Sequence, residues 1–252
     1  MAKPIAGVVF DLEGTVINME PAHHEAHIQS ARVIGVELTL ERCLDGKTVP
    51  HFIGGPDEAV ARDIANLIPR VEVGSEQWLD SVAMFLANDK AVYERLMEQR
   101  PCECRPGFWE VVAMLEAAEV SSFPITIGSS TPPEYAEIFL SRSGLREYFG
   151  ANYVILGQKA KDGKAIPDVW LECAKRLGVG ADELLVFEDS PRGIQGAVQV
   201  GATCIGMPVY NKPSVIQKLL EAGAARVFVD WREINVEELI ANLDEERARG
   251  SD

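Results

Sequence analysis

Two carboxylates one residue apart, Asp11 and Glu13, follow directly after an apolar segment at residues 5–10. An apolar run that ends abruptly at acids and a glycine is typical of a buried strand followed by a turn. Side chains alternate between the faces of a strand, so extended backbone through Leu12 would point both acids the same way. The pair suits either a Mg²⁺ site or a nucleophile beside a general acid/base, and the simplest alternative is an aspartate that only caps the next turn.

Polar residues also follow two later apolar segments. Ser129 comes after the segment 123–127, the adjacent acids Glu188 and Asp189 come after 184–187, and Lys164 precedes the helix before that second segment. If these segments are parallel strands, their carboxyl ends lie at one edge of the sheet, where such folds bind ligands. The sequence therefore predicts carboxylates, a hydroxyl and a lysine along one edge.

Helix capping explains two other residues near this edge. Thr131 is followed by two prolines and Glu134, as in a capping box, and Ser190 is followed by Pro191. Both are predicted to be N-caps with proline at the start of the helix. Capping does not explain Ser129, Lys164 or the adjacent acids.

The elements that position these residues follow from the apolar pattern. Helices and short apolar strands alternate after residue 106, which favours an α/β fold with a doubly wound, mostly parallel sheet. The predicted helices are 107–118, 131–142, 166–177, 191–199, 213–222 and 235–247, and the predicted strands are 123–127, 153–156, 184–187, 202–206 and 227–229. Between residues 16 and 100 the pattern is helical only, with helices at 20–34, 56–68 and from 75 onward, the last with a break at Asn88 and Asp89.

Composition limits the classes of partner. The 252 residues carry 24 Lys and Arg against 39 Asp and Glu, a formal net charge of −15, which argues against nucleic acid as a partner. No uncharged segment has the composition of a membrane span. Five cysteines and a first strand without a basic, apolar leader before it lead us to expect reduced thiols and a cytoplasmic location. The spacing of Cys102 and Cys104 is not that of a zinc site.

Together the motifs resemble those of the haloacid dehalogenase-like hydrolases, in particular the beta-phosphoglucomutase-like and phosphoglycolate phosphatase-like group with a helical cap. The matching segments are residues 10–15, residues 127–130, residues 163–168 with Lys164, and residues 186–194. The resemblance implies a Rossmann-like catalytic core formed by residues 1–15 and 101–252, with a helical cap domain formed by residues 16–100.

The resemblance also implies a role for each matching residue. Asp11 would attack phosphorus and form an aspartyl-phosphate, Ser129 would bind a phosphoryl oxygen, and Lys164 would supply positive charge. Mg²⁺ would be held by Asp11, the backbone carbonyl of Glu13, Asp189 and Glu188. Glu188 would act through a water molecule or by supporting the residues that bind the ion directly. The residues expected to bind substrate are Thr15, Ser130 and His23.

Glu13 departs from the pattern of most of the family, where an aspartate is the general acid and base. One extra methylene lengthens the reach by roughly 1.5 Å, and misplacement of about 1 Å can lower a rate on the order of a hundredfold. The enolase-phosphatases of the same superfamily also resemble Asp-x-Glu-Gly-Thr, so glutamate is compatible with activity. Glutamate at position 13 argues against a phosphonate hydrolase. Such enzymes use a lysine of the cap, and the candidate here, Lys47, is interpreted as a solvated lysine.

The expected function is therefore Mg²⁺-dependent hydrolysis of a small phosphorylated metabolite. A phosphomutase of the same family and a non-catalytic ligand-binding or partner-binding member are the alternatives, the second resting on Glu13 alone. His23 is expected to contact substrate, to orient Glu13, or only to pack at the hinge, while Asn18 stands where an aspartate is usual. The glycine-containing loop 45–57 around His51 and Phe52 is the candidate lid.

Overall fold

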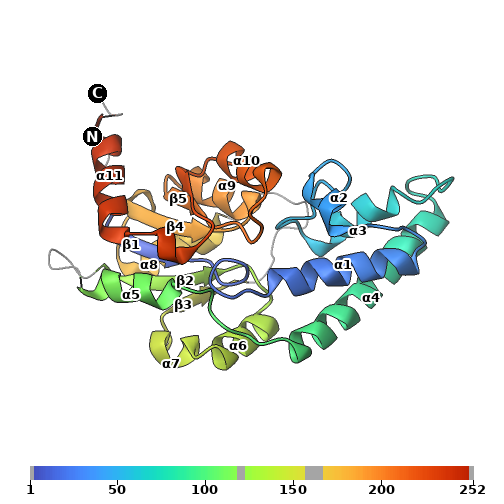
Figure 1. The fold of residues 1–252 in the computed structure, drawn as a ribbon, viewed down its shortest axis with the longest axis horizontal. Helices are drawn as coiled ribbons and strands as arrows, with labels where there is room; N and C mark the ends of the chain where they lie inside the picture. The colour runs from blue at the N-terminus through green and yellow to red at the C-terminus, as the bar shows by residue number, and fades with distance from the viewer. Residues whose placement is uncertain (1–2, 118–122, 157–166, 250–252) are drawn as a thin grey trace.

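A six-stranded sheet, with all strands parallel, forms the centre of the computed structural model, which describes residues 3–117, 123–156 and 167–249 (Figure 1). The strand order is β3-β2-β1-β4-β5-β6. The strands are β1 (Gly7–Phe10), β2 (Ile125–Ser129), β3 (Tyr153–Ile155), β4 (Leu184–Glu188), β5 (Thr203–Gly206) and β6 (Arg226–Val227). The predicted doubly wound parallel α/β fold is confirmed.

Helices cover both faces of this sheet (Figure 1). Alternation along β1 sends Val8 and Phe10 into one core and Val9 into the other. The first core includes residues of α5 (Phe108–Ala117), α6 (Pro133–Arg142), α7 (Leu145–Phe149) and α11 (Val236–Arg249), with the short 3₁₀-helix η2 (Trp231–Glu233). The second core includes residues of α8 (Asp168–Leu177), α9 (Pro191–Gln199) and α10 (Pro213–Glu221), and the 3₁₀-helix η1 (Ala181–Glu183) leads into β4.

The pairing of the strands aligns their carboxyl ends. β1 lies between β2 and β4, and Phe10 is in register with Ile127 on one side and Phe187 on the other. Asp11 therefore emerges from the sheet between the ends of β2 and β4. This is the point at which a parallel sheet of this kind binds its ligand.

The segment of residues 16–100, between the first two strands, is helical, as predicted. It contains α1 (Glu20–Val33), α2 (Leu40–Leu44), α3 (Asp57–Ala65) and α4 (Glu76–Gln99), which extend to one side of the sheet (Figure 1). These helices enclose a separate apolar core that includes Phe52, Ile64 and Phe85. Their division from the rest of the chain as a cap domain at residues 16–100 stays a prediction.

The break predicted in the last of these helices is wrong, since α4 is continuous from Glu76 to Gln99. Asn and Asp disfavour helix interiors because their side chains compete for nearby backbone groups. Here both side chains have partners on α1: Asn88 Nδ2 donates to Ser30 Oγ at 3.0 Å, and His27 Nδ1 lies 2.9 Å from Asp89 Oδ1. The competition with the helix backbone is therefore removed. None of the described helices is both long and apolar enough to cross a membrane.

Candidate active site

A cavity of about 530 Å³ lies between the carboxyl ends of the strands and the helices α1, α3 and α4. Six of the predicted site residues line it from the sheet side, namely Asp11, Glu13, Ser129, Ser130, Glu188 and Asp189. Its other side includes the predicted His23 and the unpredicted Tyr93. Lys164, predicted to be catalytic, lies outside the described residues.

Three carboxylates gather at the sheet side of the cavity. One oxygen each from Asp11, Glu188 and Asp189 can be chosen so that all lie within 4.8 Å of one another. Burial raises the pKa of all three acids above its usual value, and the neighbouring negative charges of the cluster raise the pKa of Asp11 and Glu188 further. Clustered oxygen ligands whose negative charge is only partly compensated are what a hard divalent cation requires, so these residues fit the Mg²⁺ implied by the sequence.

Asp189 is held in this cluster by the loop that follows Asp11. Thr15 Oγ1 donates a hydrogen bond to Asp189 Oδ1 at 3.2 Å, and Thr15 itself is fully buried. Gly14 has φ of 89°, and a Cβ built on it would lie 2.3 Å from Asp189 Oδ2. The structure thus places Thr15 on a carboxylate rather than along the cavity, and it requires glycine at position 14.

Gly14→Ala is expected to disrupt the metal site while leaving most of the fold intact. The new methyl group would meet the Asp189 carboxylate and would also force a positive φ on a residue with a side chain. We expect Mg²⁺ affinity to fall at least about tenfold, in the range that loss of supporting contacts around a metal produces. Isothermal titration with Mg²⁺ checks this, and Gly35→Ala, at another positive-φ glycine with open space around it, is the matched control. Equal Mg²⁺ affinity in both variants would contradict the assignment.

Glu188 is fixed by the start of α9. The backbone N–H of Ser190 donates to Glu188 Oε1 at 3.1 Å, and the Ser190 hydroxyl donates to the same oxygen. Ser190 Oγ also accepts from Gly193 N at 3.0 Å, so the predicted N-cap is confirmed. One serine therefore both begins the helix and orients an acid of the cluster.

Glu13 is held by two hydroxyl groups. Thr131 Oγ1 donates to Glu13 Oε2 at 3.1 Å, and the Tyr93 hydroxyl donates to Glu13 Oε1. Burial and the charge of Glu13 raise the pKa of Tyr93 well above its usual value, so the phenol stays protonated and can donate. The longer acid thus has a dedicated partner on the sheet side and another on α4.

Thr131 is not the helix cap that its sequence context predicts. The N-cap of α6 is Pro132, which makes no side-chain capping bond. The Thr131 backbone N–H donates instead to Ser129 Oγ at 3.1 Å, and Thr131 Oγ1 accepts from that hydroxyl at 3.0 Å. A proline disfavours helical backbone at the residue before it, which leaves Thr131 outside the helix and free to face Glu13.

His23 lies next to Tyr93. The structure of the described residues shows no hydrogen bond from His23 to Glu13. Its ring centroid lies 4.5 Å from that of Tyr93, and its Nε2 lies 3.2 Å from Asp57 Oδ1. Burial alone would lower the pKa of His23, but Asp57 and the charge of Glu20 raise it to about 10. Among the described contacts His23 reaches Glu13 only through Tyr93, and a role of His23 in orienting the acid stays a prediction.

Arg105, which was not predicted to belong to the site, supports the loop that follows Asp11. Its guanidinium donates to the carbonyl oxygens of four residues at 2.7–3.1 Å, namely Gly14, Met207, Pro208 and Val229. The charge of Arg105 also lowers the pKa of Asp189, which partly offsets burial. The only signal in the sequence is an arginine directly before Pro106 and Gly107, which does not reveal which carbonyls it binds.

The candidate lid touches the sheet side of the cavity. Gly54 has φ of 67°, and a Cβ on it would lie 2.2 Å from the Ser190 Cβ, so this glycine allows the loop to pack closely on the start of α9. His51 does not point into the cavity but lies exposed, with its Nδ1 2.9 Å from Asp63 Oδ2. Lys47 is also exposed, as expected for a solvated lysine.

Comparison with known proteins identifies the family of the chain. A family model described as haloacid dehalogenase-like hydrolase matches residues 5–201. The chain belongs to this family. It is 28% identical over 205 residues to the fructose-1-phosphate phosphatase YqaB of Escherichia coli, covering 81% of this chain and 97% of that protein. It is 27% identical over 231 residues to a phosphorylated carbohydrates phosphatase of Thermotoga maritima, covering 91% and 96%.

The fold is shared with solved structures of the same family. A haloacid dehalogenase-like hydrolase of family IA, variant 3, from Entamoeba histolytica superposes with a TM-score of 0.69 at 24% identity, covering 94% of this chain and 98% of that chain. The family model confirms the family resemblance of the sequence motifs, and this member of the family is a hydrolase with the expected Rossmann-like core.

Proposed function

We propose that this hydrolase is a Mg²⁺-dependent phosphatase that acts on a small phosphorylated carbohydrate through an aspartyl-phosphate on Asp11. The observation that carries the proposal is the pairing of two kinds of acid in one cavity. Asp11 belongs to a buried cluster of three carboxylates, and Glu13, two residues later, is held by hydroxyl groups. The first kind suits metal binding and nucleophilic attack, and the second suits proton transfer.

The reaction has two displacements at phosphorus. A carboxylate oxygen of Asp11 forms a bond to phosphorus as the bond to the ester oxygen breaks, and Glu13 gives its proton to that departing oxygen. Water then loses a proton to Glu13 and attacks the same phosphorus, which breaks the Asp11 bond and releases phosphate. Both the nucleophile and the acid are restored.

Other residues of the chain hold the groups in place. Ser129 and Thr131 form a short chain of hydroxyl groups that ends at Glu13, and Ser129 also lines the cavity where a phosphoryl oxygen would lie. Ser130, with its backbone at the end of β2, is proposed as a further phosphate contact. Lys164 is proposed to complete the positive charge around the phosphate.

Mg²⁺ would be held by Asp11, Asp189 and the Glu13 carbonyl with Glu188 in support, and when bound it would neutralise charge on the phosphate and on the acids.

The substrate class rests on two observations. The cavity of about 530 Å³ is within the usual size for a small ligand, and it carries acids, histidines and hydroxyl groups that suit a polyhydroxylated molecule. Two relatives are named as phosphatases of fructose 1-phosphate and of phosphorylated carbohydrates.

A panel of hexose and pentose phosphates, assayed for phosphate release with and without Mg²⁺, tests the proposal. Asp11→Asn serves as the blank. Release of phosphate from at least one sugar phosphate that requires both Mg²⁺ and Asp11 is the expected result. Conversion of one sugar phosphate into its isomer without release of phosphate would favour the phosphomutase, and no reaction with any member would favour a binding protein.

The metal-free protein is expected to lose stability with rising pH, and Mg²⁺ is expected to restore it. Burial raises the pKa of Asp189 to about 7 and that of Glu188 to about 8, whereas unfolded acids titrate near about 4. The folded chain therefore binds more protons than the unfolded chain, and the stability from these two acids is complete below about pH 4 and lost through about pH 7 to 8.

Mg²⁺ competes with those protons, so its stabilising effect has the opposite pH dependence. The increase in Tm on adding a fixed Mg²⁺ concentration should be larger at pH 8 than at pH 6, as thermal denaturation can measure. The same measurement on Asp189→Asn is the control, in which the increase should be small at both values. A larger increase at pH 6 in the unsubstituted protein would contradict the assignment of the cluster.

A further inference from the structure

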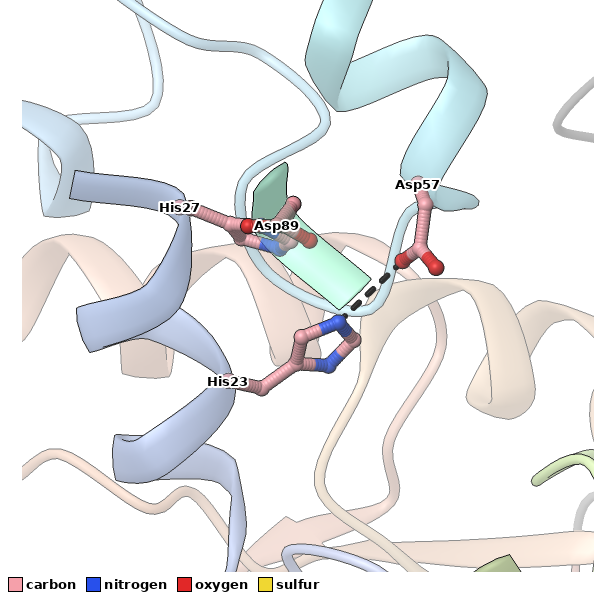
Figure 2. A group of neighbouring side chains, drawn as sticks. All are labelled: His23, His27, Asp57 and Asp89. Atoms are coloured by element: carbon pink, nitrogen blue, oxygen red, sulfur yellow. Dashed lines mark hydrogen bonds and ion pairs between the residues drawn. The ribbon is translucent and has the colours of Figure 1, made fainter. Parts of the chain in front are cut away.

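A second group of metal-binding side chains lies on the helical side of the cavity, apart from the acids at the sheet edge. His23 and His27 are one turn apart on α1, Asp57 is the first residue of α3, and Asp89 is in the middle of α4 (Figure 2). One ligand atom from each can be chosen so that all four lie within 4.8 Å of one another. No step of the proposed reaction uses His27 or Asp89.

Two pairs of these atoms have the spacing of ligands around one small ion, and all four atoms lie within 4.8 Å of one another. His27 Nδ1 lies 2.9 Å from Asp89 Oδ1, and His23 Nε2 lies 3.2 Å from Asp57 Oδ1. Ligands at about 2.0–2.1 Å from a tetrahedral Zn²⁺ are separated from one another by roughly 3.3 Å. Three separate helices therefore bring two imidazoles and two carboxylates to within about the spacing of a four-ligand site.

The orientation of Asp57 supports the same conclusion. Its Oδ1 is buried, and no described residue donates to it a hydrogen bond of regular geometry, although His23 Nε2 is only 3.2 Å away. A bound cation would satisfy this buried oxygen together with the ring nitrogen that it pairs with.

The second ring nitrogen of His23 lies near a carboxylate without a hydrogen bond to it. Its Nδ1 is 3.9 Å from Glu20 Oε2, and His24 Nε2 is closer to the same oxygen, at 3.5 Å. This carboxylate oxygen is buried without a hydrogen-bond donor among the described residues. Histidines that bind metals usually direct the other ring nitrogen toward a carboxylate or carbonyl.

We propose that His23, His27, Asp57 and Asp89 bind a divalent transition-metal ion of the Zn²⁺ type, at a site separate from the proposed Mg²⁺ site. Imidazole ligands select first-row transition metals over Mg²⁺, which prefers oxygen ligands and retains water. Because the four residues also line the cavity, the ion would present positive charge to the part of a substrate that lies beyond the phosphate. The proposal does not depend on the phosphatase activity, since it concerns binding of the ion itself.

Metal titration of the purified, metal-free protein tests the proposal directly. Zn²⁺ affinity is measured by competition with a chromophoric chelator, and Co²⁺ is added in parallel because tetrahedral Co²⁺ gives a strong visible absorption. Both are measured with Mg²⁺ in excess. The expected result is one tightly bound ion per chain with a tetrahedral Co²⁺ spectrum. A protein that binds neither ion stoichiometrically under these conditions overturns the proposal without reference to any variant.

Substitutions then locate the ion. His27→Gln and Asp89→Asn should each weaken Zn²⁺ binding by about a hundredfold or more and remove the Co²⁺ spectrum. His51→Gln is the matched control, because His51 and Asp63 form another pair at 2.9 Å, but one that is exposed and outside the cavity. Asp89→Asn preserves the size of the side chain and its hydrogen bond to His27, and thermal denaturation of the metal-free variants verifies that they fold.

A final variant separates the two metal sites. Asp189→Asn should leave Zn²⁺ affinity and the Co²⁺ spectrum unchanged, since it removes a ligand of the other cluster only. Loss of Zn²⁺ binding in Asp189→Asn, or equal Zn²⁺ binding in His27→Gln, Asp89→Asn and the unsubstituted protein, would show that the ion occupies a different place. Failure of the phosphatase assay would leave these measurements unaffected.

Discussion

Asp11→Asn should abolish hydrolysis of every phosphate ester that the protein accepts, with a fall in kcat on the order of 10⁴-fold or more. An amide oxygen is a poor nucleophile and cannot form the proposed aspartyl-phosphate. The structure places Asp11 at the end of the central strand, where burial and the charges of Glu188 and Asp189 raise its pKa. No other described carboxylate has this position between the ends of β2 and β4.

The same substitution should leave the metal-free protein at least as stable as before. Asn keeps the size of Asp but removes one of three buried negative charges that repel one another. Phosphate release and Tm are therefore measured together, with Asp63→Asn, at an acid outside the cavity, as the control for loss of an acid elsewhere. Activity retained at a tenth or more of the original rate would refute the nucleophile, while unfolding of the variant would show that Asp11 is structural.

Glu13→Gln should slow the reaction strongly, and more so for alkyl than for aryl phosphates. An alkoxide is a poor leaving group and depends on a proton from the acid, whereas a phenolate departs more easily. Loss of general acid catalysis alone lowers kcat by about 10²- to 10⁴-fold. Glu13→Asp should also lower alkyl-phosphate turnover, because the shorter side chain would draw back from Tyr93 and Thr131.

Substitution of the two residues whose hydroxyl groups donate to Glu13 tests its role more directly. Tyr93→Phe and Thr131→Val should each lower alkyl-phosphate turnover by about tenfold. Combined with Glu13→Gln, neither substitution should lower turnover any further. Tyr148→Phe is the matched control, since the Tyr148 hydroxyl donates to Glu116 at an exposed position. A rise in turnover for Glu13→Asp would mean that the glutamate is a damaging change, and full activity of Glu13→Gln would remove it from the mechanism.

The fold could be predicted because its signals are local. Most strands of the sheet are short apolar runs, and the polar residues at the carboxyl ends of β1 and β4 stand at the same edge once the strands are parallel. Asp11, Glu188 and Asp189 therefore lie close together, as predicted, because the register of β1 with β4 places their carboxyl ends side by side.

The partners of the predicted acids could not be found in the same way. Tyr93 is 80 positions from Glu13, and its place on α4 indicates only an apolar helix face. Thr131 carries a capping pattern that competes with its actual role. The pairing of His27 with Asp89 spans 62 positions and depends on how two helices cross, a property that periodicity does not encode.

Arg105 also constrains how the molecule moves during turnover. Its four bonds tie the loop after Asp11 to the chain that follows β5 and β6, so that loop can shift only if several distant segments release together. Such concerted openings are rare compared with the fraying of an isolated loop. We therefore expect substrate entry and product exit to depend on displacement of α1 to α4 and the Gly54 loop, while the phosphate end of the cavity stays in place.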